Sequence, residues 1–210
     1  MEWLLQTILS AVISSVIVVS FLSIIVNKMQ LSLELRLNGI KRIHPYGKNV
    51  KSLEKTMKKS RTIKVLGFSA LGFIHTNRKI LTAHVANGGD LEFLLASSET
   101  DFVKDAFEME GRSKDDFSLS IKQSLTLISA IEHDAIKLSE NKNNKCGKIE
   151  VKRYQTEIRN QLILCIDADQ YISAWMSVLI PPLPAVECSM IEYSNVDDCV
   201  SYYNTIWSRY

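Results

Sequence analysis

The segment Ile63–Ala96, IKVLGFSALGFIHTNRKILTAHVANGGDLEFLLA, decides the fold of this chain. It begins with the apolar run IKVLGF and ends with LEFLLA, and each run has the length and composition of a buried strand. Between them, Leu71–Ala86 carries apolar residues at helical spacing and ends at the run NGGD, where glycine takes its usual position after a helix. Two such strands joined through one helix predict a βαβ unit with parallel strands.

The chain after this unit supplies a long helix and a second group of strands. Ser118–Ser139 is amphipathic at helical spacing, and the polar run NKNNKCG at 141–147 ends it. The pattern predicts an α/β domain with a mixed or parallel sheet over residues 62–210. Its remaining elements are strand-like runs at Lys148–Tyr154, Gln161–Asp167, Trp175–Ile180 and Met190–Tyr193, and a closing helix at Val196–Trp207.

Residues 1–27 predict a transmembrane anchor. Trp3–Val26 contains 24 uncharged residues, and a helix rising about 1.5 Å per residue would cross a hydrocarbon core of about 30 Å. A cleaved signal peptide is the alternative, but the first residues are not basic and the apolar run is too long for one. We therefore expect a single-pass protein with one N-terminal transmembrane helix.

The charge after this helix predicts its orientation. Residues 27–64 hold eleven basic and two acidic residues and so have a net charge of +9, whereas the chain after residue 64 has a net charge of −6. The positive-inside rule then places the N-terminus outside and the C-terminal domain in the cytoplasm, at the inner (plasma) membrane. We interpret residues 28–61 as a basic juxtamembrane connector and helix, attracted to the headgroups of the lipid bilayer.

The same charge distribution disfavours nucleic acid as a partner. The basic stretch has no interleaved aromatic residues, and the domain that follows it is acidic. The four cysteines form no CxxC pair, so we expect no metal site and no cofactor. Cys165 lies within an apolar run, which is typical of a small core residue.

Two segments resemble the phospholipase D-like superfamily. The first is Ile63–Ala96, which is similar to the opening strand–helix–strand unit of such domains. The second is NQLILCID, residues 160–167, which aligns with the HxKxxxxD motif of that family. Asn160 stands at the position of the histidine, Leu162 at that of the lysine and Asp167 at that of the aspartate. The resemblance covers residues 62–207 and implies a phospholipase D-like α/β fold.

The departures from the motif decide the chemistry that the resemblance implies. In that family the histidine attacks the phosphodiester and the lysine stabilises the phosphate charge. Neither asparagine nor leucine can replace them, so we expect no catalytic residues of this type. The domain then resembles a degenerate member of the superfamily that keeps a binding cleft.

Candidate ligand-binding residues lie near the ends of the predicted strands. Ligands of open parallel sheets bind outside the carboxyl ends of the strands, and arginine can hold a phosphate there through two hydrogen bonds. The alternative is that the aspartates shape a turn and that Arg153 pairs with Glu157 on the surface. The candidates are Gly67, Ser69, Arg153, Arg159, Asn160, Asp167 and Asp169.

Three functions remain open from the sequence. The first is a membrane-anchored, non-catalytic cytoplasmic sensor or effector, which resembles the membrane effectors of prokaryotic anti-phage defence systems. It would act as a homo-oligomer through the serine-rich face of the anchor and respond to a nucleotide-type or protein signal. The second is a membrane-bound phosphodiesterase or nuclease with a non-standard site around His75, His84 and Asp167. The third is a passive membrane scaffold that recruits a protein partner.

Overall fold

The structure of the chain is a computed structural model that divides into two compact units, Met1–Ile40 and Lys41–Tyr210. In the first unit, residues 22–30 and 33–35 are helical. The second unit contains the sheet and the helices that surround it. The described residues are 20, 22–30, 33–35, 37–44, 50–102, 105, 108, 111–158, 160–167, 170–178, 189–193 and 196–210.

The predicted membrane anchor is corrected by the structure. Most of Trp3–Val26 lies outside the described residues, which include only 20 and 22–26 of that stretch. Among the described residues, the helices are all too short or too polar to cross a bilayer. We therefore do not retain the prediction of a single-pass, inner-membrane protein with the lipid bilayer as its partner.

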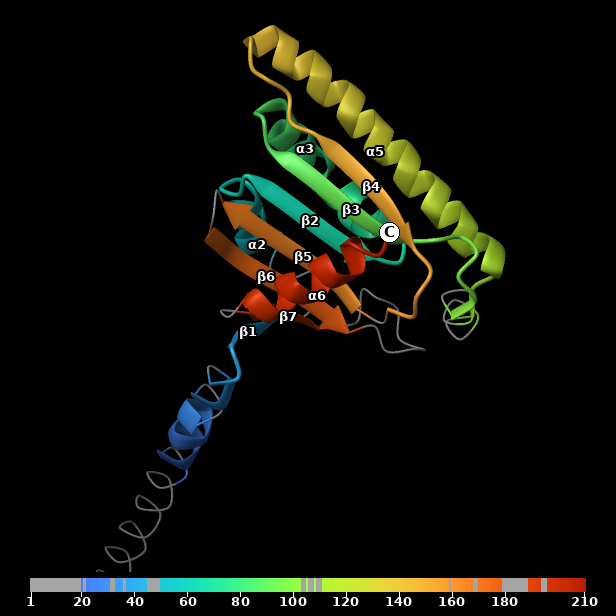
Figure 1. Ribbon diagram of the computed structural model, residues 1–210. Helices are drawn as coiled ribbons and strands as arrows, with labels where there is room; N and C mark the ends of the chain where they lie inside the picture. The colour runs from blue at the N-terminus through green and yellow to red at the C-terminus, as the bar shows by residue number, and fades with distance from the viewer. Residues whose placement is uncertain are drawn as a thin grey trace, which may run out of the picture. The chain divides into compact units, whose positions relative to one another are not determined.

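A seven-stranded mixed sheet forms the second unit, in the order β1-β7-β6-β5-β2-β3-β4. Strands β2, β3 and β4 are parallel, while β5, β6 and β7 are antiparallel to their neighbours (Figure 1). The predicted mixed α/β fold is thus confirmed. The elements are β1 (Ile40–His44), α2 (Val50–Met57), β2 (Thr62–Gly67), α3 (Leu71–Ala86), β3 (Asp90–Ala96), α5 (Lys114–Lys142), β4 (Ile149–Tyr154), β5 (Asn160–Asp167), β6 (Gln170–Val178), β7 (Met190–Tyr193) and α6 (Asp197–Trp207).

The predicted βαβ unit is present as β2, α3 and β3. Thr62 lies opposite Asp90 and Gly67 opposite Leu95, so the two strands are parallel and start at the same edge of the sheet. Val65 and Phe93 are fully buried in this core, and burial of each such side chain contributes about 2 kcal/mol. The helix has the bounds that its apolar spacing predicts, because the apolar side chains it turns inward pack on these strands.

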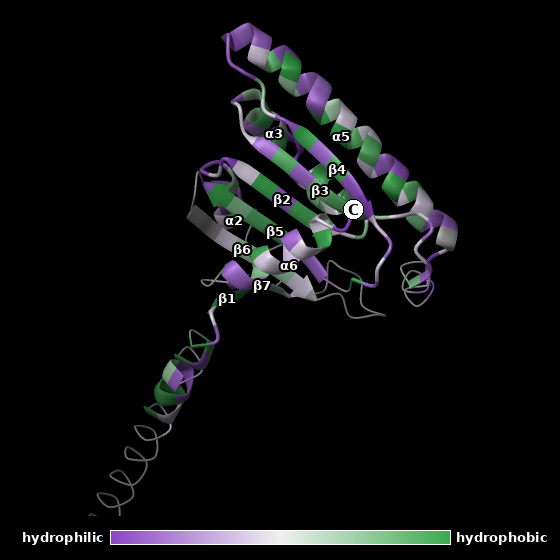
Figure 2. Cartoon of the chain, in the orientation of Figure 1, coloured by the Kyte–Doolittle hydropathy of each residue, from purple (hydrophilic) through white to green (hydrophobic). Residues whose placement is uncertain are grey.

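Strand β5 departs from the expected parallel arrangement. It pairs antiparallel with β2, with Thr62 opposite Ile166 and Leu66 opposite Leu162. The strand is green over most of its length in Figure 2, and its residues 161–165 are buried. Asn160 and Asp167 therefore lie at opposite ends of the strand, about 24 Å apart at about 3.4 Å per residue.

Helices cover both faces of the sheet. In Figure 1, α3 lies behind the sheet and packs on α5, whereas α6 crosses in front. Helix α5 begins earlier than its apolar pattern predicts, because Ser113 and Asp116 form a capping box. Under α6, Lys64 makes a 2.9 Å ion pair with Glu92 and lies 5.2 Å from the ring centre of Tyr203.

An ion pair between the exposed Lys41 and the buried Glu192 fixes the edge strand β1 against β7. The carboxylate of Glu192 accepts hydrogen bonds from Lys41 Nζ at 2.7 Å and His44 Nε2 at 3.1 Å, and the His44 ring stacks on Trp175. Burial alone would raise the pKa of Glu192, but the two hydrogen bonds outweigh it and lower that pKa. In β5, burial raises the pKa of Cys165 to about 12, consistent with the predicted core role of this thiol.

Candidate nucleic-acid interface

Three turns meet at the edge of the sheet where the parallel strands begin. They are residues 58–61 before β2, 87–89 before β3 and 143–148 before β4. The register aligns the strand starts, and hydrogen bonds join the turns. Asp90 N donates to the Arg61 carbonyl at 2.9 Å, and Lys148 N donates to Asp90 Oδ1 at 2.8 Å. The parallel pairing of the strands thus brings together three segments that are far apart in the sequence.

This edge gathers six exposed cationic side chains, which we call the basic edge. Acids near it include Asp90, Asp167 and Glu140. Asp90 accepts the backbone N–H of Lys148, so part of its charge is used within the protein. The six cations face solvent, which favours an anionic partner. The members of the basic edge are Lys58, Lys59, Arg61, Lys142, Lys145 and Lys148.

The opposite edge, where the parallel strands end, is acidic. Acidic side chains follow β3 and open α5, and Asp115 and Asp116 occupy the first turn of that helix. The net negative charge of the domain is therefore distributed unevenly, with cations at one edge of the sheet and acids at the other. The acidic residues of this opposite edge are Glu99, Asp101, Asp105, Glu108, Asp115 and Asp116.

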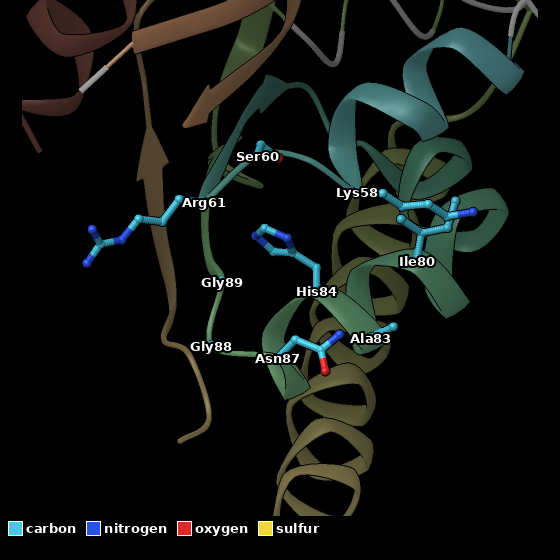
Figure 3. A pocket seen from close by; sticks show the side chains of 9 residues that line it. All are labelled: Lys58, Ser60, Arg61, Ile80, Ala83, His84, Asn87, Gly88 and Gly89. Atoms are coloured by element: carbon cyan, nitrogen blue, oxygen red, sulfur yellow. The ribbon is translucent and has the colours of Figure 1, made fainter. Parts of the chain in front are cut away.

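A pocket of about 280 Å³ opens within the basic edge. It lies between the turn that leads into β2 and the carboxyl end of α3 (Figure 3). In Figure 3 the ring of His84 lies in the middle of the group, while Arg61 and Lys58 extend to its two sides. The pocket is lined by Lys58, Ser60, Arg61, Ile80, Ala83, His84, Asn87, Gly88 and Gly89.

His84 is held in the pocket by backbone contacts to Asp90 and Arg61 and by close packing. Its Nε2 lies 3.2 Å from the Asp90 carbonyl and donates to it. A Cβ on Gly89 would lie only 2.3 Å from the imidazole, so this glycine makes room for the ring. Burial lowers the pKa of His84, with Asp90 opposing the shift. Burial therefore favours the neutral form of the ring.

Gly147 holds two turns of the basic edge together. Its N–H donates to the Val85 carbonyl at 2.8 Å. A Cβ at this position would lie 2.0 Å from the Gly89 carbonyl oxygen, which is a backbone atom that cannot rotate away. Only glycine permits this close approach of the 143–148 turn to the 87–89 turn.

The candidate residues from the sequence do not form one site. Gly67, Ser69 and Asn160 lie at the acidic edge, where Ser69 Oγ accepts the N–H of Leu71 at 3.4 Å. Asn160 is hydrogen-bonded to Tyr202 of α6. Their acidic surroundings disfavour a phosphate ligand there.

Arg153 is exposed on the edge strand β4 opposite Leu95, which lies opposite Gly67, so it belongs to the same edge as Gly67 and Asn160. Asp167 lies beside the start of β2, at the basic edge. Arg159 and Asp169 lie outside the described residues. Over the described part of the chain, groups of three or more potential metal ligands are absent.

Sequence reasoning missed the basic edge because its members fall in three separate segments. Lys58, Lys59 and Arg61 were assigned to a membrane connector, and NKNNKCG was read only as the end of a helix. The sequence does contain a signal for this edge, because the basic segments precede strands that are predicted to be parallel. The starts of parallel strands lie at one edge, just as their ends do.

Comparison with known proteins gives no family for the chain. No family model matches it, and no curated protein matches it. One solved structure that matches is described as "Structure of TrmBL2, an archaeal chromatin protein, shows a novel mode of DNA binding". The two chains share 11% identity with a TM-score of 0.45, and the match covers 90% of this chain and 63% of that chain. A likeness of this extent assigns no function to the chain.

These findings correct two further predictions. The resemblance to the phospholipase D-like superfamily is not retained, since no family model matches the chain. The prediction that nucleic acid is disfavoured is not retained either, because its premise fails. The basic connector residues Lys58, Lys59 and Arg61 join lysines of the domain on one edge.

Proposed function

We propose that the domain Lys41–Tyr210 is a non-catalytic recognition domain that binds the phosphate backbone of nucleic acid along the basic edge. The observation that carries this proposal is the gathering of six exposed cations from three turns, opposite an acidic edge. Nucleic acids carry a dense row of negative charge, and lysine and arginine contacts to phosphates supply most of the non-specific affinity. In a sensor or effector, the bound strand would be the signal.

The composition of the edge favours recognition of the backbone over recognition of bases. Residues 58–61, 87–90 and 142–148 contain no aromatic side chain on which a base could stack. Phosphate contacts position a nucleic acid without reading its sequence. The proposed binding is therefore independent of sequence.

Two features support a non-catalytic role over the phosphodiesterase alternative. The three residues proposed for that site do not all come together: Asp167 and His84 share the basic edge, but His75 lies nine residues from His84 on α3, about 13 Å along its axis. The ring of His84 is also committed through Nε2 to a backbone carbonyl. Neither histidine is thereby placed beside a partner for nucleophilic attack on a phosphodiester.

A salt titration tests the proposed function. The purified chain is titrated into fluorescently labelled duplexes of unrelated sequence, and anisotropy reports binding. If four to six cations contact phosphates, log Kd should rise with log salt with a slope of about 4 to 5, about 10³-fold between about 50 mM and about 200 mM. The duplexes should bind equally well. Absence of binding at low salt, or an affinity independent of salt, would contradict the proposal.

A further inference from the structure

We propose that the pocket around His84 receives the terminal phosphate of a nucleic-acid strand bound along the basic edge. This inference rests on the proposed function and adds to it the part of the nucleic acid that is recognised. The pocket opens within the same edge and shares Lys58 and Arg61 with it. A strand held by its internal phosphates would therefore present its end at the pocket.

The size of the pocket suits one end group and not a continuous strand. Its volume of about 280 Å³ lies at the lower limit of small-molecule sites, about 300 Å³. Residues 88 and 89 are glycines, so backbone forms this part of the wall, and the His84 ring packs against Gly89. The pocket thus has room for a phosphate with its sugar.

The polar groups of the pocket are suited to a phosphate that carries two charges. Lys58 and Arg61 line the pocket, and in Figure 3 their side chains extend outward on opposite sides of His84. The amide oxygen of Asn87 accepts from Lys142 Nζ at 3.4 Å, so the donor end of this amide is available to an acceptor. Internal phosphodiesters carry one charge, whereas a terminal phosphomonoester carries about −1.5 to −2 at pH 7. The pocket therefore favours the end over the interior of a strand.

Proton uptake by His84 couples this recognition to pH. Nε2 already donates to the Asp90 carbonyl, so a proton added to Nδ1 would give the ring a second donor. The charged groups around the ring are Lys58 and Arg61 from the turn before β2, Asp90 from β3 and Lys142 from α5. A bound dianion would stabilise the protonated ring against the burial that disfavours its charge. Binding of a terminal phosphate should then strengthen as the pH falls from about 8 toward the ordinary imidazole pKa of about 6.5.

Matched oligonucleotides test this inference. One short duplex is prepared with 5′-phosphates, with 3′-phosphates or with hydroxyl ends, and each is titrated at about pH 7 and about pH 8. We expect the wild-type chain to bind at least one phosphorylated form about tenfold more tightly than the hydroxyl form, equivalent to one added charge-assisted hydrogen bond. A free nucleoside 5′-monophosphate should compete poorly, since it lacks the backbone contacts.

Variants locate the preference. Asn87→Asp places a negative charge at an exposed position of the pocket and should abolish the preference for phosphorylated ends. His84→Gln should abolish the pH dependence of that preference. His133→Gln, at an exposed histidine of α5, is the matched control and should keep both. Thermal melting shows whether each variant is folded. If His84→Gln does not fold, the loss of the end preference in Asn87→Asp tests whether the pocket binds the terminal phosphate.

The outcomes separate the two proposals. Equal, salt-dependent binding of all three duplexes would overturn the terminal-phosphate inference and leave the proposed function intact. If the free monophosphate binds as tightly as the phosphorylated duplex, the proposal that the ligand is a strand end would be wrong. Failure of every duplex to bind would overturn both proposals.

Discussion

The double variant Lys58→Glu/Lys145→Glu is expected to bind duplex DNA about 100-fold more weakly than the wild-type chain at low salt. The two lysines come from different turns, before β2 and before β4, and both are exposed. Each change removes a phosphate contact and adds a charge that repels the backbone. The slope of log Kd against log salt should fall by about two, since two ion pairs with phosphate are lost. Fluorescence anisotropy at several salt concentrations measures both effects.

A second double variant with the same change in charge provides the control. Lys122→Glu/Arg153→Glu alters exposed cations of α5 and β4 that lie outside the basic edge. Its affinity should stay within about threefold of the wild-type value, because exposed charges more than a Debye length of about 10 Å away are largely screened at 0.1 M salt. Equal losses in the two variants would show that net charge and not the basic edge governs binding.

The substitution Gly147→Ala is expected to destabilise the domain by about 3 kcal/mol. The new Cβ would overlap the Gly89 carbonyl oxygen at 2.0 Å, and two turns would have to move apart. This movement would also break the hydrogen bond from Gly147 N to the Val85 carbonyl. Urea denaturation followed by circular dichroism gives the free energy of unfolding.

Gly72→Ala is the matched control for this substitution. No heavy atom lies within 4 Å of a Cβ built there, and the residue belongs to the first turn of α3. Alanine is the better helix former, so the free energy of unfolding should rise by up to about 1 kcal/mol. Equal effects of the two substitutions would contradict the proposed close approach at Gly147.

The sequence was sufficient to predict the elements of the sheet but not all of its pairing. Apolar runs and helical spacing located β2, α3 and β3 closely, because those patterns record local burial. The direction of β5 was missed, since an apolar run reads the same in a parallel or an antiparallel strand. That single difference moved Asp167 from the expected site to the opposite edge of the sheet.

The candidate site was harder to predict than the fold. Exposed lysines carry no periodic signal, and their significance depends on which turns the sheet brings together. Lys58 and Lys145 are separated by 86 intervening residues, yet both belong to turns that lead into parallel strands. The close packing of His84 on Gly89 and of Gly147 on Gly89 depends on distances that no sequence pattern records.

The central claim is that the basic edge is the surface that contacts nucleic acid, and mapping the binding surface tests it most directly. Backbone amide NMR spectra of the chain, titrated with the unlabelled duplex used in the salt titration, provide this map. The account predicts that the largest shift changes fall in residues 58–61, 87–90 and 142–148. Changes concentrated instead at the acidic edge, or in the apolar groove between α3 and α5 around Leu71, Leu119 and Leu127, would contradict it.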